Sequence, residues 1–216
     1  MAQESIFNPG RPTFEESDLR TSLSTIESQM RTYRPAVLKL GDDKHAAVAL
    51  MLRQTPEHVE ALFIERAQHE SDPWSGQMAL PGGMVEGFDV DARRAAERET
   101  LEEVGIDLST AVYLGRLDDQ QGRHRGHTAG IVVRGYVYAV DTAAQPRVNN
   151  EVEDIVWVPV QRLLDARNYT QIAHPVYPGE KFPGIRVSDK EHQVVWGLTR
   201  RFIASFFTTI QVVFEG

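Results

Sequence analysis

Short apolar runs alternate along the chain with segments in which apolar residues recur every three or four positions. The short runs are typical of buried strands, and they predict strands at Ala46–Leu52, Ala61–Arg66, Ala111–Leu117, Ala129–Val140 and Glu153–Val160. The helical spacing predicts helices at Phe14–Thr32, Val90–Val104, Gln161–Ala166 and His192–Phe207. Strands and helices intermix without a regular strand–helix–strand repeat, which favours an α/β fold with a mixed sheet flanked by helices.

The remaining segments are predicted from their turn-forming and polar residues. Residues 168–188 should be irregular, because they contain Pro175, Pro178 and Pro183. The stretches HESDPWSGQ and DDQQGRHRGH are polar and contain glycine, so we expect loops there. The first helix should begin with a capping box, because its start has that spacing at Thr13 and Glu16.

The length and the charge of the chain limit its number of domains and its kinds of partner. The chain has 216 residues, enough for one large core and too few for two comfortable domains. We expect residues 1–12 to be a flexible lead-in and residues 13–216 to form one domain. The net charge of −8 argues against a nucleic-acid partner. A phosphorylated small molecule stays possible, because a bound metal can reverse the local field.

Several kinds of site and location are excluded or disfavoured. The chain has no cysteine, which excludes disulfides, thiolate metal sites and cysteine nucleophiles. Its start, MAQESIFNPG, lacks the basic and apolar regions of a secretory signal, and no apolar run reaches the roughly 18 residues of a membrane span. We therefore expect a cytoplasmic protein with no membrane partner. The sequence leaves both a monomer and a homodimer open.

Three glutamates concentrate negative charge on one helix. Glu99, Glu102 and Glu103 lie at i, i+3 and i+4 of the predicted helix Val90–Val104, so they share one face. Their repulsion costs a few tenths of a kcal/mol per i,i+4 pair. The last two also lie near the helix C-terminus, where the dipole disfavours anions. Folding gains nothing from this arrangement.

The other residues of this helix suggest how the carboxylates are used. Val90, Leu101 and Val104 gather on the opposite side, and we expect them to pack on the core. Small residues flank the carboxylates and leave room for a ligand: Ala92, Ala95 and Ala96.

A divalent cation would offset the repulsion between the three carboxylates. Mg²⁺ and Mn²⁺ prefer oxygen ligands, and Mg²⁺ commonly binds one or two carboxylates together with substrate phosphates. The preceding Gly82 and Gly83 have no Cβ, so their backbone can approach the same ligand closely. The alternative is a solvated helix stabilised by the pairs Arg93–Glu97 and Arg98–Glu102.

The stretch from Gly83 to Ile106 resembles the Nudix box. That box is a glycine, five residues, an acid, seven residues, and then Arg-Glu-apolar-x-Glu-Glu-x-Gly-apolar. This chain departs from it in three ways: Asp89 replaces the usual glutamate, eight residues separate it from Arg98, and Thr100 stands at an apolar position. The Arg-Glu-x-x-Glu-Glu-x-Gly core is intact, in its expected context of glycine turn and helix.

The resemblance implies a fold, a reaction and a set of site residues. The fold would be an α/β/α sandwich with a mixed sheet, and the reaction the hydrolysis of a diphosphate linked to another moiety. Mg²⁺ or Mn²⁺ would be held by Glu99, Glu102 (directly or through water), Glu103 and the Gly83 carbonyl. Arg98 would orient the glutamates. The metal would neutralise the diphosphate and activate the attacking water.

The general base is less well defined by the sequence. In some Nudix enzymes it is a glutamate of the box, and here that candidate is Glu99. In others it comes from a distant loop, and here Glu151 and Glu153 precede the strand IVWVP. The alternative for these two is an ordinary polar turn before an edge strand.

A longer resemblance points to a substrate. The segment ALFIERAQHESDPWSGQMALPGG resembles the coenzyme A diphosphatase branch, which also tends to have the eight-residue gap, and EVEDIVWVPV and HQVVWGLTRRF resemble its late strand and final helix. It implies hydrolysis of coenzyme A or acyl-CoA to 3′,5′-ADP and (acyl-)4′-phosphopantetheine. Expected substrate contacts are Arg66, Trp74, Gly82 and Arg116.

Some features leave other substrates and roles open. Ser71 stands where the branch has an arginine, and basic residues that could replace it are Arg116, Arg123, Arg125 and His127. Trp74 either stacks on an adenine or is a half-buried anchor, whereas Trp157 and Trp196 should belong to the core. The alternative substrates are ADP-ribose, a nucleotide sugar or a nucleoside triphosphate. A catalytically silent nucleotide-sensing module is the third interpretation.

Overall fold

The computed structural model describes residues 22–39, 44–69, 74–122, 130–175 and 177–215. Its strands are β1 Lys44–Gln54, β2 Val59–Arg66, β3 Met78–Ala79, β4 Gly82–Met84, β5 Val112–Arg116, β6 Gln120–Gly122, β7 Ile131–Ala139, β8 Val152–Pro159, β9 Tyr169–His174, β10 Tyr177–Arg186 and β11 Val194–Trp196. Its α-helices are α1 Leu23–Thr32, α2 Ala92–Val104, α3 Val160–Leu164 and α4 Gly197–Thr209. Short 3₁₀ turns cover Leu108–Thr110 and Ala166–Asn168.

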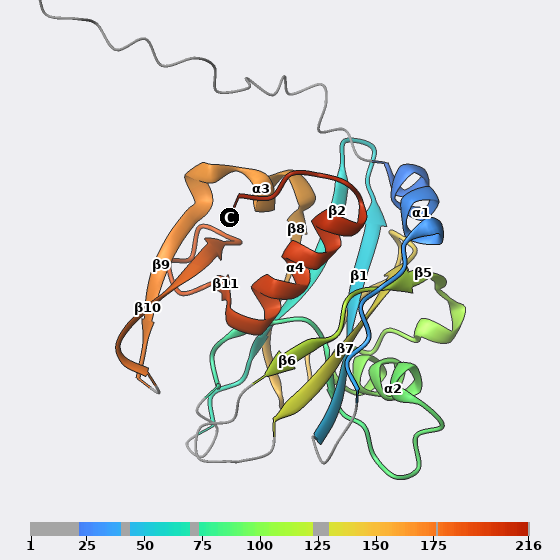
Figure 1. Ribbon diagram of the computed structural model, residues 1–216, viewed down its shortest axis with the longest axis horizontal. Helices are drawn as coiled ribbons and strands as arrows, with labels where there is room; N and C mark the ends of the chain where they lie inside the picture. Colours follow the sequence, from blue (N-terminus) through green and yellow to red (C-terminus); the bar gives the residue numbers. More distant parts are fainter. Residues whose placement is uncertain (1–21, 40–43, 70–73, 123–129, 176, 216) are drawn as a thin grey trace, which may run out of the picture.

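One large mixed sheet forms the middle of the molecule (Figure 1). Its strands follow the order β3-β2-β1-β7-β5, with β4 paired to β1, β6 to β7 and β8 to β2. The central strands β1 and β7 run parallel, from the pair Lys44–Ile131 to the pair Leu52–Ala139. The other strand pairs of the described chain are antiparallel. The predicted mixed α/β sheet is therefore confirmed.

Helices cover both faces of this sheet because β1 is apolar on both sides. Leu50 and Leu52 belong to the core that includes residues of α1 and α4. Ala49 and Met51 alternate with them and belong to the core under α2. Figure 1 shows α2 on one side of the sheet and α4 on the other. The result is the three-layer α/β/α arrangement.

A second, three-stranded sheet has the order β11-β10-β9. The prediction that residues 168–188 are irregular was wrong, because β9 and β10 both lie there. Two of the prolines are accommodated at positions where one side of β10 is unpaired. β11 pairs only with Gly184 to Arg186, so Pro183 bonds toward β9 alone. Pro178 falls in the register shift between Tyr177 and Lys181.

The last predicted helix and one predicted loop also contain strands. The segment predicted as helix His192–Phe207 begins with β11, and α4 starts only at Gly197, whose positive φ of 55° turns the chain between the two. The β-branched Val194 and Val195 favour the extended conformation. In the predicted loop DDQQGRHRGH, β6 pairs with the start of β7.

The N-terminal predictions lie mostly outside the described residues. The lead-in 1–12, Thr13, Glu16 and the start of the first helix belong to residues 1–21. The described part, α1, has Ser22 as its N-cap, whose side chain accepts a hydrogen bond from the Thr25 amide at 3.2 Å. Within the residues that the structure describes, every helix is too short or too polar to cross a bilayer.

Candidate active site

The box helix α2 packs its alanines and Val104 against the sheet, which confirms the prediction for Val104. Ala92, Ala95 and Ala96 are at most 3% exposed. The prediction that Val90 and Leu101 pack on the core was wrong, since they are 90% and 50% exposed. A helical wheel gives the faces of a helix and not which face meets the sheet. The small alanines let α2 approach closely, and they carry the glutamates of the same face inward.

The two ends of α2 follow from local sequence. The helix begins at Ala92 rather than Val90, because the Asp91 side chain accepts a hydrogen bond from the Arg94 amide at 2.9 Å. It ends at Gly105, which has the left-handed φ of 69°. Thr100 is fully buried at the position where the box has an apolar residue, and its hydroxyl donates to the Ala96 carbonyl at 2.7 Å. That bond removes the cost of burying the hydroxyl.

Strand β4 brings the glycine turn against the inner glutamates. The Gly82 amide donates to Glu103 Oε2 at 2.8 Å. A Cβ on Gly83 would lie 2.4 Å from the carboxyl carbon of Glu99, and one on Gly82 would lie 2.1 Å from the Ala47 carbonyl oxygen. Gly82 therefore requires glycine, because its φ is 145° and backbone atoms obstruct a Cβ, whereas at Gly83 a Cβ would displace the end of the Glu99 side chain from the turn.

Burial and neighbouring carboxylates disfavour the anionic forms of Glu99 and Glu103. Glu103 is only 3% exposed, and burial raises its pKa to about 7. The Gly82 amide and Arg66 oppose this rise, whereas Glu99 and Glu151 add to it. The pKa of Glu99 is also raised, first by burial and further by the charges of Glu102 and Glu151, against the opposing effect of Arg98.

Arg98 links the outer part of the site. Its guanidinium donates to both carboxylate oxygens of Asp89 at 3.1 Å, to Glu99 at 2.8 Å and to Glu102 at 3.2 Å. It also donates to the Met84 carbonyl at 3.1 Å, which connects α2 to β4. Asp89, one methylene shorter than the usual glutamate of the box, thus reaches Arg98 with both oxygens.

The solvated-helix alternative describes the outer side of α2. Arg93 and Glu97 form an ion pair at 3.2 Å, and Arg98 and Glu102 form another at 3.2 Å. Glu102 is largely exposed, unlike Glu99 and Glu103. The helix therefore has one exposed carboxylate, Glu102, whereas the side chains of Glu97 and Glu99 are only 11% and 17% exposed and Glu103 is buried.

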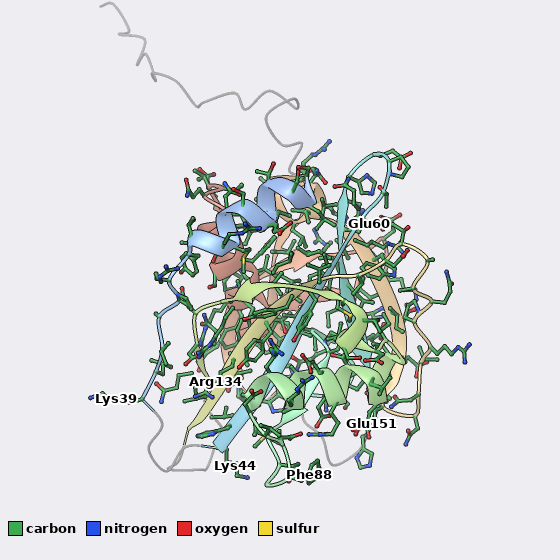
Figure 2. The ribbon with its side chains drawn as sticks, turned by 90° about the vertical axis from the view of Figure 1, so that its right-hand side faces the viewer. Lys39, Lys44, Glu60, Phe88, Arg134 and Glu151 are labelled. Carbon is green, nitrogen blue, oxygen red and sulfur yellow. The ribbon has the colours of Figure 1, made fainter. Side chains whose placement is uncertain are left out.

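Of the two loop glutamates, the structure brings Glu151 to the carboxylates. Figure 2 shows Glu151 beside α2, and its charge raises the pKa of both Glu99 and Glu103. The charge of Glu153 instead acts on Lys190. Asn149, which the sequence analysis missed, ties this loop to α2: its amide donates to the Glu102 carbonyl at 2.9 Å and its oxygen accepts from the Glu151 amide at 2.8 Å. Its only sequence signal was the turn-forming pair Asn149-Asn150.

The donor set suits a hard divalent cation, although the side chains do not yet converge on one point. In the described part of the chain, no three acidic or histidine side chains already surround a common position that would hold a metal. The charge of Glu151 nevertheless raises the pKa of both Glu99 and Glu103, and the charge of Glu99 raises that of Glu103 further. A cation that accepts oxygen ligands would reverse that effect.

A cavity of about 940 Å³ opens beside the glycine turn, between the main sheet and the three-stranded sheet. Arg66, Trp74, Gly82 and Gly83 line it, so four of the residues predicted for the site meet there. Arg116 does not: it pairs with Asp119. Ser71, Arg123, Arg125 and His127 lie outside the described residues.

The three tryptophans occupy different environments. Trp74 is half-buried and stacks on His174, with ring centroids 5.4 Å apart and an interplanar angle of 13°. Trp196 is 7% exposed, as expected for a core residue, and also lines the cavity. Trp157 is only half-buried, which corrects the prediction of a core residue, and lies under the guanidinium of Arg53 at 4.1 Å.

Known proteins resemble the chain in sequence and in fold. The sequence model of the NUDIX domain matches residues 43–178. An uncharacterized protein of Schizosaccharomyces pombe is 36% identical over 177 residues, which are 73% of this chain and 53% of that protein, so the chain spans about half of that relative. An uncharacterized Nudix hydrolase of Salmonella dublin, NudL, is 27% identical over 199 residues, which are 89% of this chain and 97% of that protein. A crystal structure of a MutT/nudix family protein from Enterococcus faecalis has the same fold, with a TM-score of 0.52, 16% identity, and coverage of 90% of this chain and 71% of that one.

Proposed function

The chain belongs to the NUDIX domain family, and we propose that it is a divalent-metal-dependent diphosphatase that hydrolyses a nucleoside diphosphate linked to another moiety. The domain match and the Nudix hydrolase relatives support a pyrophosphohydrolase enzyme. The observation that carries the proposal is the pair Glu99 and Glu103 against the glycine turn that lines the cavity: Glu103 is buried, and the side chain of Glu99 is only 17% exposed. Burial of two like charges costs stability, and a metal diphosphate would reverse that cost.

Nudix hydrolases generally use divalent metal ions, and we assign Mg²⁺ or Mn²⁺ here. The proposed ligands are Glu99, Glu102, Glu103 and the Gly83 carbonyl. When bound, the metal supplies charge neutralisation and an activated water. Arg98 keeps Glu99 and Glu102 in position through its hydrogen bonds. The Gly82 amide does the same for Glu103.

Two glutamates compete for the role of general base. Glu151 is exposed beside the buried pair and is held by Asn149, whereas the carboxylate of Glu99 is engaged by Arg98. This arrangement favours Glu151. Glu151→Gln should lower kcat far more than it changes KM, and Glu99→Gln should change metal affinity as well. A change of only a few-fold in kcat for Glu151→Gln would remove it from this role.

Coenzyme A or acyl-CoA is the proposed substrate. The support is the resemblance of the segment before the box to the coenzyme A diphosphatase branch, together with the eight-residue gap after Asp89. A cavity of about 940 Å³ also has room for more than a nucleotide alone. Ser71 in place of the branch's arginine leaves ADP-ribose, a nucleotide sugar or a nucleoside triphosphate as the second candidate.

The test is a substrate panel with product identification. Coenzyme A, dephospho-coenzyme A, ADP-ribose, a nucleotide sugar and the common triphosphates are each incubated with Mg²⁺ and with Mn²⁺. Coenzyme A should give 3′,5′-ADP and 4′-phosphopantetheine, and dephospho-coenzyme A should react about ten- to a hundredfold more slowly, because one charge-assisted contact is lost. Faster turnover of ADP-ribose would reject the substrate and keep the diphosphatase. No turnover of any compound, with metal still bound, would favour the silent nucleotide-sensing module.

A further inference from the structure

We propose that four aromatic side chains at one end of the cavity, Trp74, Tyr177, Phe182 and Trp196, bind the planar base of the substrate's nucleotide. We call these four residues the aromatic wall. The inference rests on the proposed function for the statement that a nucleotide enters the cavity. It adds the part of the ligand that the wall recognises and the residues that select it.

The aromatic wall is one continuous surface made from three parts of the chain. Trp74 precedes β3, Tyr177 and Phe182 lie on β10, and Trp196 ends β11. Ring centroids are 5.3 Å apart for Phe182 and Trp196 and for Tyr177 and Phe182, and 6.2 Å apart for Trp74 and Trp196. All four residues line the cavity. Residues far apart in sequence therefore present their rings to one space.

The wall is not simply part of the core. Trp74, Tyr177 and Phe182 are half-buried, whereas core residues such as Phe63 and Phe202 are at most 1% exposed. Aromatic surface left open to a cavity lacks the packing that stabilises a core ring. A planar ligand ring would supply that packing by stacking, in a manner that tolerates different bases.

The charges around the cavity point to the same class of ligand. The charged residues among its described lining are all arginines, Arg66, Arg200 and Arg201, although the net charge of the chain is −8. Arg66 is close enough to Glu103 to lower its pKa. Apolar rings together with arginines suit a molecule with a flat uncharged part and an anionic part. A nucleoside diphosphate has both.

His174 acts behind the wall as a positioning residue. It is not among the residues that line the cavity, but its ring stacks on Trp74 and lies 5.0 Å from Trp196. Its Nε2 is 3.0 Å from the amide nitrogen of Gln77. Burial lowers the pKa of His174, so its ring is uncharged at neutral pH and stacks without a desolvated charge. The ring thus fixes the plane of Trp74.

Part of the wall lies beyond the family's common sequence. The NUDIX domain match ends at residue 178, and Phe182 and Trp196 follow it. The carboxylates of α2 lie within the match. In this chain, the later strands would therefore select the base while the box acts on the diphosphate.

The wall can be tested by ligand binding without metal and without turnover. Intrinsic tryptophan fluorescence is titrated with ADP, and ribose 5-phosphate serves as the ligand without a base. ADP should quench the signal, because a base would stack beside Trp74 and Trp196. Trp74→Ala and Phe182→Leu should weaken ADP binding about ten- to a hundredfold, measured by calorimetry. Trp74→Phe keeps a ring and should stay within a few-fold of the unaltered protein.

The matched control is Trp157→Phe, because Trp157 lies under Arg53 and does not line this cavity. It should leave both quenching and affinity unchanged. Unchanged ADP affinity in Trp74→Ala and Phe182→Leu would overturn the proposal, as would equal binding of ribose 5-phosphate. Binding of 4′-phosphopantetheine in place of ADP would show that the wall takes an apolar arm, which also overturns it. If ADP binds to the aromatic wall as expected but no compound of the substrate panel is hydrolysed, only the proposed function is rejected.

The role of His174 has its own readout. His174→Ala should raise KM about tenfold with little change in kcat, because it loosens Trp74 and leaves the carboxylates untouched. His174→Phe supplies a flat ring and should restore KM. Failure of His174→Phe to restore KM in a folded variant would contradict positioning by stacking.

Discussion

Two groups of acids, each with one buried member, behave in opposite ways. Glu65 is 7% exposed, and one of its carboxylate oxygens accepts a hydrogen bond from Gln193 Nε2 at 2.8 Å. Its other carboxylate oxygen lies 3.2 Å from His192 Nε2. Asp154 accepts from the same Gln193 nitrogen and from Lys190, both at 2.8 Å, and Lys190 is the main reason that its pKa is lowered. We call Glu65, Asp154, Lys190, His192 and Gln193 the latch cluster.

The carboxylates of α2 form the contrasting group. Burial raises the pKa of both Glu99 and Glu103, and neighbouring acids raise it further. The acids of the latch cluster are compensated by partners of the same chain, the buried Gln193 and the exposed Lys190 and His192, and these contacts join the segment before β11 to β2 and β8. The box carboxylates have too little compensation inside the fold. The difference separates acids that are compensated within the chain from acids that we propose to bind a cation from solution.

The largest expected effect comes from removing the metal. A chelator should abolish turnover, and Mg²⁺ or Mn²⁺ should restore it, because the box carboxylates have no internal substitute for the cation. Turnover is measured by product formation with and without EDTA. The latch cluster contains none of the proposed metal ligands, so it should not respond to the chelator. Full turnover in metal-free buffer would contradict the comparison.

The next effect is that of Glu103→Gln on activity. The change keeps the shape and the bond from the Gly82 amide but removes the charge of a proposed ligand, so kcat/KM should fall on the order of 10²-fold or more. Steady-state kinetics at saturating Mg²⁺ measures it. Glu27→Gln, in an exposed pair on α1, is the control and should have no effect. Near-normal turnover of Glu103→Gln would remove Glu103 from the site.

A smaller effect concerns stability without metal. Folding raises the pKa of Glu103 from its unfolded value to about 7. The contribution of Glu103 to the free energy of unfolding is therefore fully present below about pH 4.5 and is lost as the pH rises through 7. The free energy of unfolding should therefore fall by up to about 3 kcal/mol between pH 5 and pH 8 because of this group. Glu103→Gln should flatten that slope in urea unfolding with EDTA present. If Glu103→Gln leaves the slope of the free energy of unfolding against pH unchanged, a different group is responsible for the pH dependence.

The smallest effect is expected in the latch cluster. Gln193→Leu removes the donor to Glu65 and Asp154 and should lower the free energy of unfolding by about 2 kcal/mol, since a buried acceptor is left unsatisfied. Metal affinity of the box carboxylates, measured by calorimetry with Mn²⁺, should not change. A loss of metal affinity without a loss of stability would show that the two groups are not separate.

Local patterns predicted the central strands, α2 and the carboxylates that the Arg-Glu-x-x-Glu-Glu-x-Gly motif places on one helix face, because each depends on residues close together in the sequence. Prediction failed where distant segments decide. Pro183 is typical of a strand breaker until the pairing of β10 with β11 is known to stop at Gly184. Val90 reads as a core residue until the alanine face is seen to meet the sheet. Asn149 and Gln193 act through partners far away in the chain, so neither had more than a weak local signal.

The parallel pairing of β1 with β7 also sets the order in which the chain can fold. The middle of the sheet forms only when Lys44 pairs with Ile131 and Leu52 pairs with Ala139. Everything that carries the box, from β3 to the end of α2, lies between these partners in sequence. Closure of such a long loop has an entropic cost and slows folding. During synthesis, the apolar strand β1 would emerge well before its central partner and would rely on the nearby hairpin partner β2 for cover.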